Sequence, residues 1–199
     1  MNPDQIFRWL VVALIVIQLP LMARFRLKAR TNEPLDRRQE GLFVLITLRL
    51  AGLAMFVGLV AYLVNPSSMA WAAAPFPDWL RWTAVAMGGS AGMLILWTMS
   101  TLGGNLTDTV VTRKHHTLVT NGPYRFVRHP FYDSVGLWIG ACAVAASNWF
   151  VLAGGAAVFT LLVLRTAAEE ERLVARFGEA YRTYMDQTGR FLPRLGAQH

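Results

Sequence analysis

Long apolar runs constrain the fold of this chain more than any other feature of its sequence. Residues 6–23, 42–64 and 82–102 form the first three runs, and polar or charged segments separate them. A helix needs about 20 mostly apolar residues to cross a hydrocarbon core of about 30 Å, so these runs are long enough or nearly so. Together with two shorter runs that follow, they predict an all-α fold, a polytopic transmembrane helical bundle of about five spans.

The two shorter runs, 131–147 and 149–164, are separated by Asn148 alone. At a rise of about 1.5 Å per residue, each is marginal as a full span. This spacing predicts a short helical hairpin with its turn at residues 147–148. We expect the chain to form a single integral membrane domain, 1–199, with three N-terminal spans in 1–102 and a distinct C-terminal half in 103–199.

The charged residues predict how the chain is oriented in the membrane. The net charge is +7, but the cations gather beside apolar runs, which is typical of cytoplasmic membrane loops rather than of nucleic-acid binding. The segment 24–38 holds six cations against two acids. We therefore expect membrane lipids and no nucleic acid as partners, a place in the inner or plasma membrane, the N-terminus outside and the C-terminus in the cytoplasm.

After residue 164 the pattern becomes amphipathic. Leu173, Phe177, Tyr181 and Tyr184 recur on one helical stripe, and this predicts a cytoplasmic helix at the C-terminal end.

Two charges inside the apolar runs have no assigned role. Arg49 can reach the interface by extending its side chain or face a polar ligand inside the bundle, and Asp133 is the only charge in the hairpin.

The segment 114–132 concentrates polar and aromatic residues between two apolar runs and holds three of the four histidines. Neighbouring histidines splay apart and no H-E-x-x-H pattern accompanies them, so we expect no metal site. His129 precedes a proline, which biases it toward an extended or turn conformation and aims its ring out of the following helix. This segment is the first half of a predicted polar site.

Arg165 and Glu169 supply the second half. They lie four residues apart, on one face of a helix, directly after the last apolar run. One reading is a surface ion pair; the other is a functional site at the membrane junction. The three consecutive acids 169–171 point around half of the helix circumference, so we expect one of them to face inward. From the residues alone, the sequence predicts a polar site on the cytoplasmic face and no more.

These pieces together resemble the isoprenylcysteine carboxyl methyltransferase family and its phospholipid methyltransferase relatives. The matching text is H-T-L-V at 116–119, G-P-Y at 122–124, R-H-P-F-Y at 128–132, and R-x-x-x-E-E-x-x-L-x-x-x-F-G-x-x-Y-x-x-Y at 165–184. The resemblance covers about the last 100 residues and implies S-adenosyl-L-methionine as cofactor and methyl donor. By position, the residues implied to bind it are His116, Thr117, Leu118, Val119, Tyr124, His129, Pro130, Phe131, Tyr132 and Glu169.

The resemblance further implies that Arg165 is the catalytic residue and binds the substrate. We therefore predict an integral membrane methyltransferase that needs no metal and acts on a carboxylate, thiol or amine of a small or lipidic acceptor. Asp133 lies beside the presumed path of that acceptor, and its negative charge weighs against an anionic acceptor. Two alternatives remain: an NADPH-dependent membrane reductase related to the sterol reductases, which carry about twice as many spans, and a non-catalytic membrane scaffold.

Overall fold

A computed structural model describes residues 2–29, 42–105 and 117–194, and every structural statement below concerns those residues. They form helices and no named strand, so the predicted all-α fold is confirmed. The α-helices are α1 (Pro3–Lys28), α2 (Leu42–Val64), α3 (Asp78–Leu102), α4 (Pro130–Ala145), α5 (Trp149–Phe177) and α6 (Glu179–Gln187). Three short 3₁₀ helices complete the set: η2 (Pro66–Ala72), η3 (Gly103–Asn105) and η4 (Gly122–Arg125).

All five predicted apolar runs are helical. Among the described residues, 4 helices are long and apolar enough to cross a membrane: α1, α2, α3 and α5. The fifth run is α4, which has only 16 residues and forms the short arm of the hairpin. Arg49 is exposed on α2, in keeping with a side chain that reaches toward the membrane interface.

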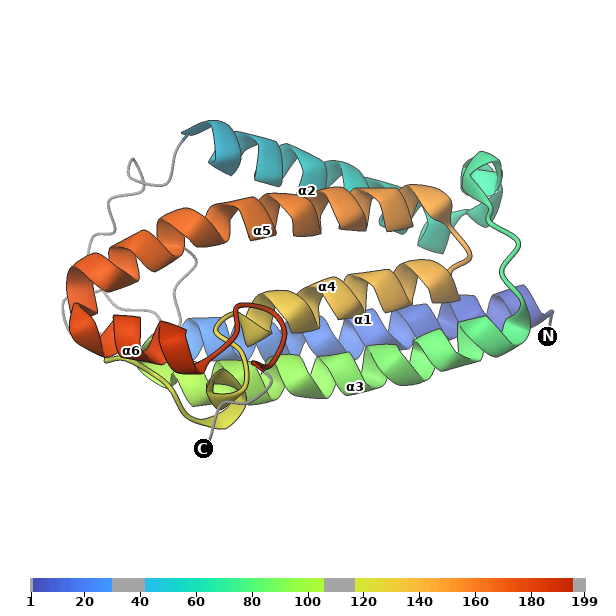
Figure 1. The fold of residues 1–199 in the computed structure, drawn as a ribbon. Helices are drawn as coiled ribbons and strands as arrows, with labels where there is room; N and C mark the ends of the chain where they lie inside the picture. Colours follow the sequence, from blue (N-terminus) through green and yellow to red (C-terminus); the bar gives the residue numbers. More distant parts are fainter. Residues whose placement is uncertain (1, 30–41, 106–116, 195–199) are drawn as a thin grey trace.

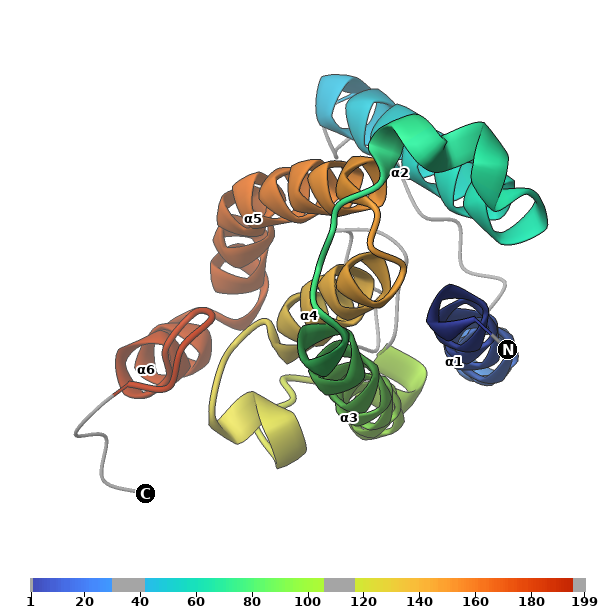
Figure 2. The same ribbon diagram turned by 90° about the vertical axis from the view of Figure 1, so that its right-hand side faces the viewer.

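Helix α4 lies at the centre of the bundle. It packs mainly against α3 and α5, while α1 lies beside α3 and α2 beside α5 (Figures 1 and 2). Small residues on α4 let these neighbours approach closely. Its buried alanines and Cys142 meet Val11 of α1, Leu59 of α2 and Val151 of α5 in one apolar core.

The turn between α4 and α5 falls where the sequence predicts it. Ser147 has a positive φ of 49°, and the buried Asn148 caps α5 by accepting a hydrogen bond from the backbone N–H of Val151 at 3.0 Å. An N-cap of this kind satisfies a donor that the first helical turn leaves unpaired. Since the hairpin is then tightly closed, residues at the start of α4 lie beside residues 169–170 of α5.

A second polar anchor holds the end of the bundle near this turn. Arg81, only 4% exposed, donates to the Asp4 carboxylate at 2.7 Å and to the carbonyl oxygen of Ala145 at 3.1 Å. Its guanidinium also lies 4.0 Å from the centre of the Phe7 ring. These contacts join α1, α3 and the end of α4, so the two ends of α4 are fixed by different networks.

Close packing of the hairpin gives a first testable prediction. A Cβ added at Gly136 of α4 would lie 2.5 Å from Cδ2 of Phe159 on α5, which forces one helix or the ring to move. We expect Gly136→Ala to destabilise the protein by about 1–3 kcal/mol, as overpacking of a filled core does. Thermal denaturation in detergent measures this difference.

Gly140 provides the matched control, because it lies on the same helix and its added Cβ would meet nothing within 4 Å. Gly140→Ala should leave stability unchanged or raise it slightly, since alanine favours helix over glycine. Equal destabilisation by both substitutions would contradict this account of the α4–α5 contact.

Candidate active site

The two predicted halves of the polar site do meet, at the end of the bundle opposite the α4–α5 turn (Figure 1). The first turn of α4 and the residues just before it lie against the part of α5 that follows its apolar run. The chain after α6 returns to the same place and pairs with residues 127–129. Three segments far apart in sequence therefore build this site.

Pro130 fixes how the first segment enters α4. It occupies the start of the helix, where its fixed φ suits the first turn and its missing N–H costs nothing. A proline also disfavours helical backbone at the preceding residue, and His129 accordingly has φ −121° and ψ 51°. The imidazole is thereby turned toward α5, where its Nε2 lies 3.2 Å from Oε1 of Glu170.

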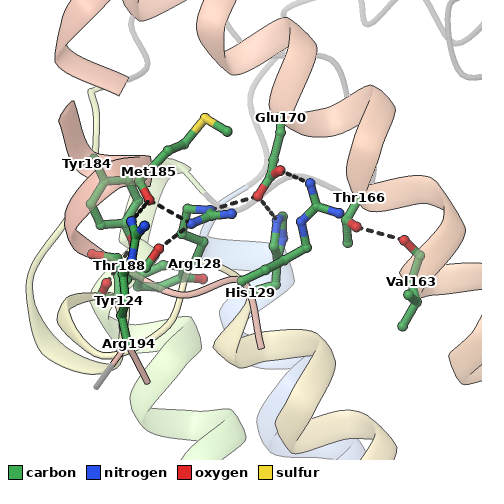
Figure 3. A network of polar contacts seen from close by, with 11 residues as sticks. Tyr124, Arg128, His129, Val163, Thr166, Glu170, Tyr184, Met185, Thr188 and Arg194 are labelled. Carbon is green, nitrogen blue, oxygen red and sulfur yellow. Dashed lines mark hydrogen bonds and ion pairs between the residues drawn. The ribbon is translucent and has the colours of Figure 1, made fainter. Parts of the chain in front are cut away.

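Glu170 is the centre of a buried network (Figure 3). This side chain is 3% exposed, and it is the one of the three consecutive acids that faces inward; Glu169 is half-buried and Glu171 is exposed. Arg128 donates to Oε1 at 2.7 Å, and Arg190 donates to Oε2. The buried carboxylate is therefore hydrogen-bonded through both oxygens, which such a group requires.

Arg128 also ties this network to the end of the chain. Its Nη1 donates to the carbonyl oxygens of Met185, at 3.1 Å, and Thr188 (Figure 3). Nearby, the Tyr184 hydroxyl donates to the carbonyl oxygen of Tyr124 at 2.6 Å. One guanidinium thus connects α5 with the C-terminal turn of α6, and one phenol connects α6 with η4.

The charges around Glu170 control its ionisation. Burial alone would raise the pKa of this carboxyl, but hydrogen bonds from His129, Arg190 and Arg128 outweigh it and lower the pKa from 4.5 to about 2. Glu170 lies beyond the apolar part of α5, which ends at residue 164, so it belongs to the amphipathic extension of that helix. At neutral pH it is a carboxylate.

Glu169, one residue earlier, takes part in a different contact. The Tyr132 hydroxyl donates to its Oε2 at 2.8 Å, so the predicted residues of α4 and α5 are joined directly. Arg165, one turn before Glu169, lies near enough to Tyr132 to interact electrostatically with its hydroxyl. Burial raises the pKa of Tyr124, and the nearby Glu169 carboxylate raises it further. Tyr124 therefore lies close to Glu169.

The other predicted residues fall into three groups. Pro130 is buried under the site, and Phe131 packs toward the apolar cluster of α1 and α3 that contains Ile95 and Met99. Leu118 and Val119 are half-buried and Thr117 is exposed, and their role stays a prediction. His116 lies outside the described residues.

Sequence reasoning missed several residues of this site: Arg128, Glu170, Tyr184, Arg190 and Phe191. Each of them had some signal in the sequence. One inward-facing acid was expected among 169–171, although the site role went to Glu169; Arg128 stands inside the R-H-P-F-Y text, and Tyr184 ends the predicted helical stripe. Arg190 and Phe191 stand in the text G-R-F-L-P at 189–193, which is close to the family's pattern, but no periodicity in this irregular segment predicts its return to the core. Among the described residues, no group of three or more histidine, cysteine or acidic side chains is arranged to hold a metal ion.

Comparison with solved structures concerns the fold. The fold resembles the solved structure titled "Structure of the eukaryotic intramembrane Ras methyltransferase ICMT (isoprenylcysteine carboxyl methyltransferase) without a monobody", with a TM-score of 0.56 and 23% sequence identity over 77% of this chain and 54% of that one. The chain therefore shares the helical fold of that structure. Residues 84–175, somewhat less than half of the chain, match the model of the "Isoprenylcysteine carboxyl methyltransferase (ICMT) family".

Several curated relatives carry the name of the same enzyme. The protein-S-isoprenylcysteine O-methyltransferase of Dictyostelium discoideum is 34% identical over 100 residues, covering 49% of this chain and 42% of the relative. The human protein of that name is 33% identical over 122 residues, covering 58% and 42%. The cobalt-zinc-cadmium resistance protein CzcN of Cupriavidus metallidurans is 38% identical over 86 residues, covering 42% and 38%. The matched segments thus span less than half the length of these relatives.

Proposed function

We propose that this protein is an integral membrane, S-adenosyl-L-methionine-dependent methyltransferase whose site faces the cytoplasm. The observation that carries the proposal is the contact between Tyr132 and Glu169 beside Arg165. It joins two halves of a polar site within the residues that match the family, at the point where α5 leaves its apolar part. The basic segments around this end of the bundle support a cytoplasmic position, with the N-terminus on the outer side.

The residues present suit this cofactor, which carries a sulfonium, an amino acid and a nucleoside. Within the described part of the chain, the Glu169 carboxylate accepts the hydrogen bond from Tyr132, and a carboxylate can accept several. It can therefore also accept from an ammonium or a hydroxyl. The rings of His129 and Tyr132 are stacked, with centroids 5.6 Å apart, and offer an aromatic wall. Aromatic faces attract a sulfonium as they attract other cations. When bound, the cofactor would supply an electrophilic methyl group.

In the proposed reaction, the protein aligns the acceptor with that methyl group. Methyl transfer is an in-line displacement, so most of the rate gain comes from holding the reacting atoms in the right geometry. Arg165 would orient an acceptor by charge-assisted hydrogen bonds, and Glu169 would hold the donor. No proton transfer is needed if the acceptor is a carboxylate.

We propose a carboxylate, thiol or amine of a small or lipidic molecule as the acceptor. The isoprenylcysteine named for several relatives makes a free S-isoprenylcysteine the first compound to test, while the relative named for metal resistance supports a wider search. Asp133 is half-buried in the first turn of α4, one residue after Tyr132. Its charge is the reason to include amines and thiols in that search.

Calorimetric titration of the detergent-solubilised protein tests the proposal. S-adenosylmethionine and S-adenosylhomocysteine should bind, whereas NADPH should not. Absence of binding by both adenosyl compounds, in protein with a cooperative thermal transition, would refute a methyltransferase. Binding of NADPH alone would instead support the reductase, and no binding of any of the three would support a non-catalytic scaffold.

Glu169→Gln should weaken binding of S-adenosylhomocysteine about tenfold, because one charged hydrogen-bond acceptor for the ligand is lost. Glu171→Gln is the matched control: it removes the same charge from an exposed position two residues away and should leave the affinity unchanged. An unchanged dissociation constant in the Glu169 variant would remove that residue from the proposed cofactor site.

A further inference from the structure

The segment that follows α6, residues 188–191, returns to the site and pairs with the residues that precede α4. Val127 and Gly189 form a parallel bridge. The backbone N–H of Arg128 donates to the carbonyl oxygen of Gly189 at 2.9 Å, and that of His129 donates to the carbonyl oxygen of Arg190 at 3.1 Å. We refer to residues 188–191 as the C-terminal strap.

Two side chains of the strap then act on the same neighbours. Arg190 donates to Oε2 of Glu170, on the side of the carboxylate opposite to the oxygen that His129 and Arg128 share. The ring of Phe191 lies 5.7 Å from the His129 ring and 6.4 Å from Phe159 of α5, centroid to centroid. Backbone and side chains of the strap therefore all meet at His129 and its carboxylate partner.

These contacts determine the state of the His129 ring. A carboxylate oxygen only accepts hydrogen bonds, so Nε2, 3.2 Å from Oε1 of Glu170, must carry a proton. Arg128 and Arg190 hold the Glu170 carboxylate in place for this contact.

The fixed ring in turn orients Tyr132. The two rings are parallel within 3°, and the Tyr132 hydroxyl donates to Glu169. A continuous series of contacts therefore runs from Arg190 through Glu170, His129 and Tyr132 to Glu169. Its first member lies 21 residues beyond Glu169 in the chain, outside the predicted site.

We propose that Arg190 and Phe191 are positioning residues of this site, which hold the His129 ring in one orientation, with its Nε2–H toward Glu170, and thereby set the geometry of the Tyr132–Glu169 pair. Arg190 does this through Glu170, and Phe191 through direct ring contact. The effect on cofactor affinity rests on the proposed methyltransferase function, but the effect on the histidine ring does not.

Two measurements on the full-length protein test this proposal. The first is nitrogen-15 NMR of histidine-labelled protein in detergent, with the His129 signals assigned by a His129→Gln variant. Wild type should show one set of His129 ring signals, with Nε2 protonated. Arg190→Met should show more than one set of His129 signals, whereas Arg190→Lys, which keeps a cation opposite Glu170, should keep the wild-type signals.

The second measurement is affinity for S-adenosylhomocysteine. Arg190→Met and Phe191→Leu should each weaken binding about fivefold, the loss expected when one hydrogen-bonded or packed support is removed. Arg190→Lys should stay within about twofold of wild type. Arg194→Met is the matched control, since Arg194 follows the strap but donates to carbonyl oxygens of α6 and not to Glu170.

The outcomes separate this proposal from the proposed function. Wild-type histidine signals in Arg190→Met would overturn the positioning role, whatever the affinity. If no adenosyl compound binds even to wild type, the proposed function fails, while the change in the His129 signals still decides the role of Arg190. Should Arg190→Met fail to fold, Arg190→Lys and Phe191→Leu carry the test: Phe191→Leu must disturb the His129 signals and Arg190→Lys must not.

Discussion

Glu170→Gln should destabilise the protein by about 3–5 kcal/mol, the cost of removing one partner from a buried charge network. The substitution keeps the shape of the side chain but leaves Arg128 and Arg190 without the negative charge that both now contact. Glutamine also offers only one accepting oxygen, so one donor among Arg128, His129 and Arg190 loses its partner. Thermal denaturation in detergent measures the loss.

Glu171→Gln again serves as the control, because it removes an acid from an exposed position on the same helical turn. Surface substitutions of this kind change stability by about 0.5 kcal/mol or less. If the two variants were equally stable, the network around Glu170 would contribute nothing to holding α5, α4 and the C-terminal strap together.

The dependence on pH follows from the same network. The pKa of Glu170 is lowered from its ordinary 4.5 to about 2 in the folded protein. A depressed folded pKa means that this carboxylate stabilises the fold fully above about pH 4.5, and that the contribution is lost as the pH falls toward 2. The difference in stability between wild type and Glu170→Gln should therefore shrink over that interval. A constant difference would show that the carboxylate charge does not contribute.

How far the fold follows from the sequence depends on the kind of signal. A continuous block of about 20 apolar residues is long enough to cross a bilayer as a helix, so the helices and the hairpin turn at Asn148 were predictable. The buried Arg81 was not, because it stands at the start of an apolar helix and nothing nearby in sequence reveals its partner, Asp4. Contacts between residues 77 apart in the chain are set by how α1 and α3 pack.

The site shows the same division between local and distant information. The H-P step at residues 129–130 fixes the local backbone, and this allowed the prediction that the His129 ring leaves the helix. Its partner depended on the rotation of α5 about its axis, which brings Glu170, rather than Glu169 or Glu171, to the His129 ring. Hydrophobic periodicity indicates which side of α5 faces the core, but it does not identify which of three adjacent acids is buried.

Arg165→Met should lower the turnover number at least about 100-fold while leaving the affinity for S-adenosylhomocysteine within about twofold, if Arg165 orients the acceptor as proposed. Methionine keeps much of the length of the side chain but removes the charge and the donors. Transfer of a labelled methyl group to S-isoprenylcysteine, or to whichever acceptor the search identifies, measures turnover. Calorimetry measures affinity in the same preparations.

Two further variants make the result specific to Arg165. Arg182→Met removes a cation that pairs with Glu179 on the exposed face of α6, and it should leave both quantities unchanged. Arg165→Lys should recover turnover only in part, because an ammonium keeps the charge but cannot present the planar pair of donors that a carboxylate accepts. Full recovery of turnover by lysine would favour simple charge attraction. If the acceptor is a thiol, the loss of turnover in Arg165→Met should be much smaller than if it is a carboxylate. Cofactor affinity that fell as much as turnover would instead place Arg165 against the cofactor. An interaction made equally in the ground and transition states changes binding without changing the chemical step.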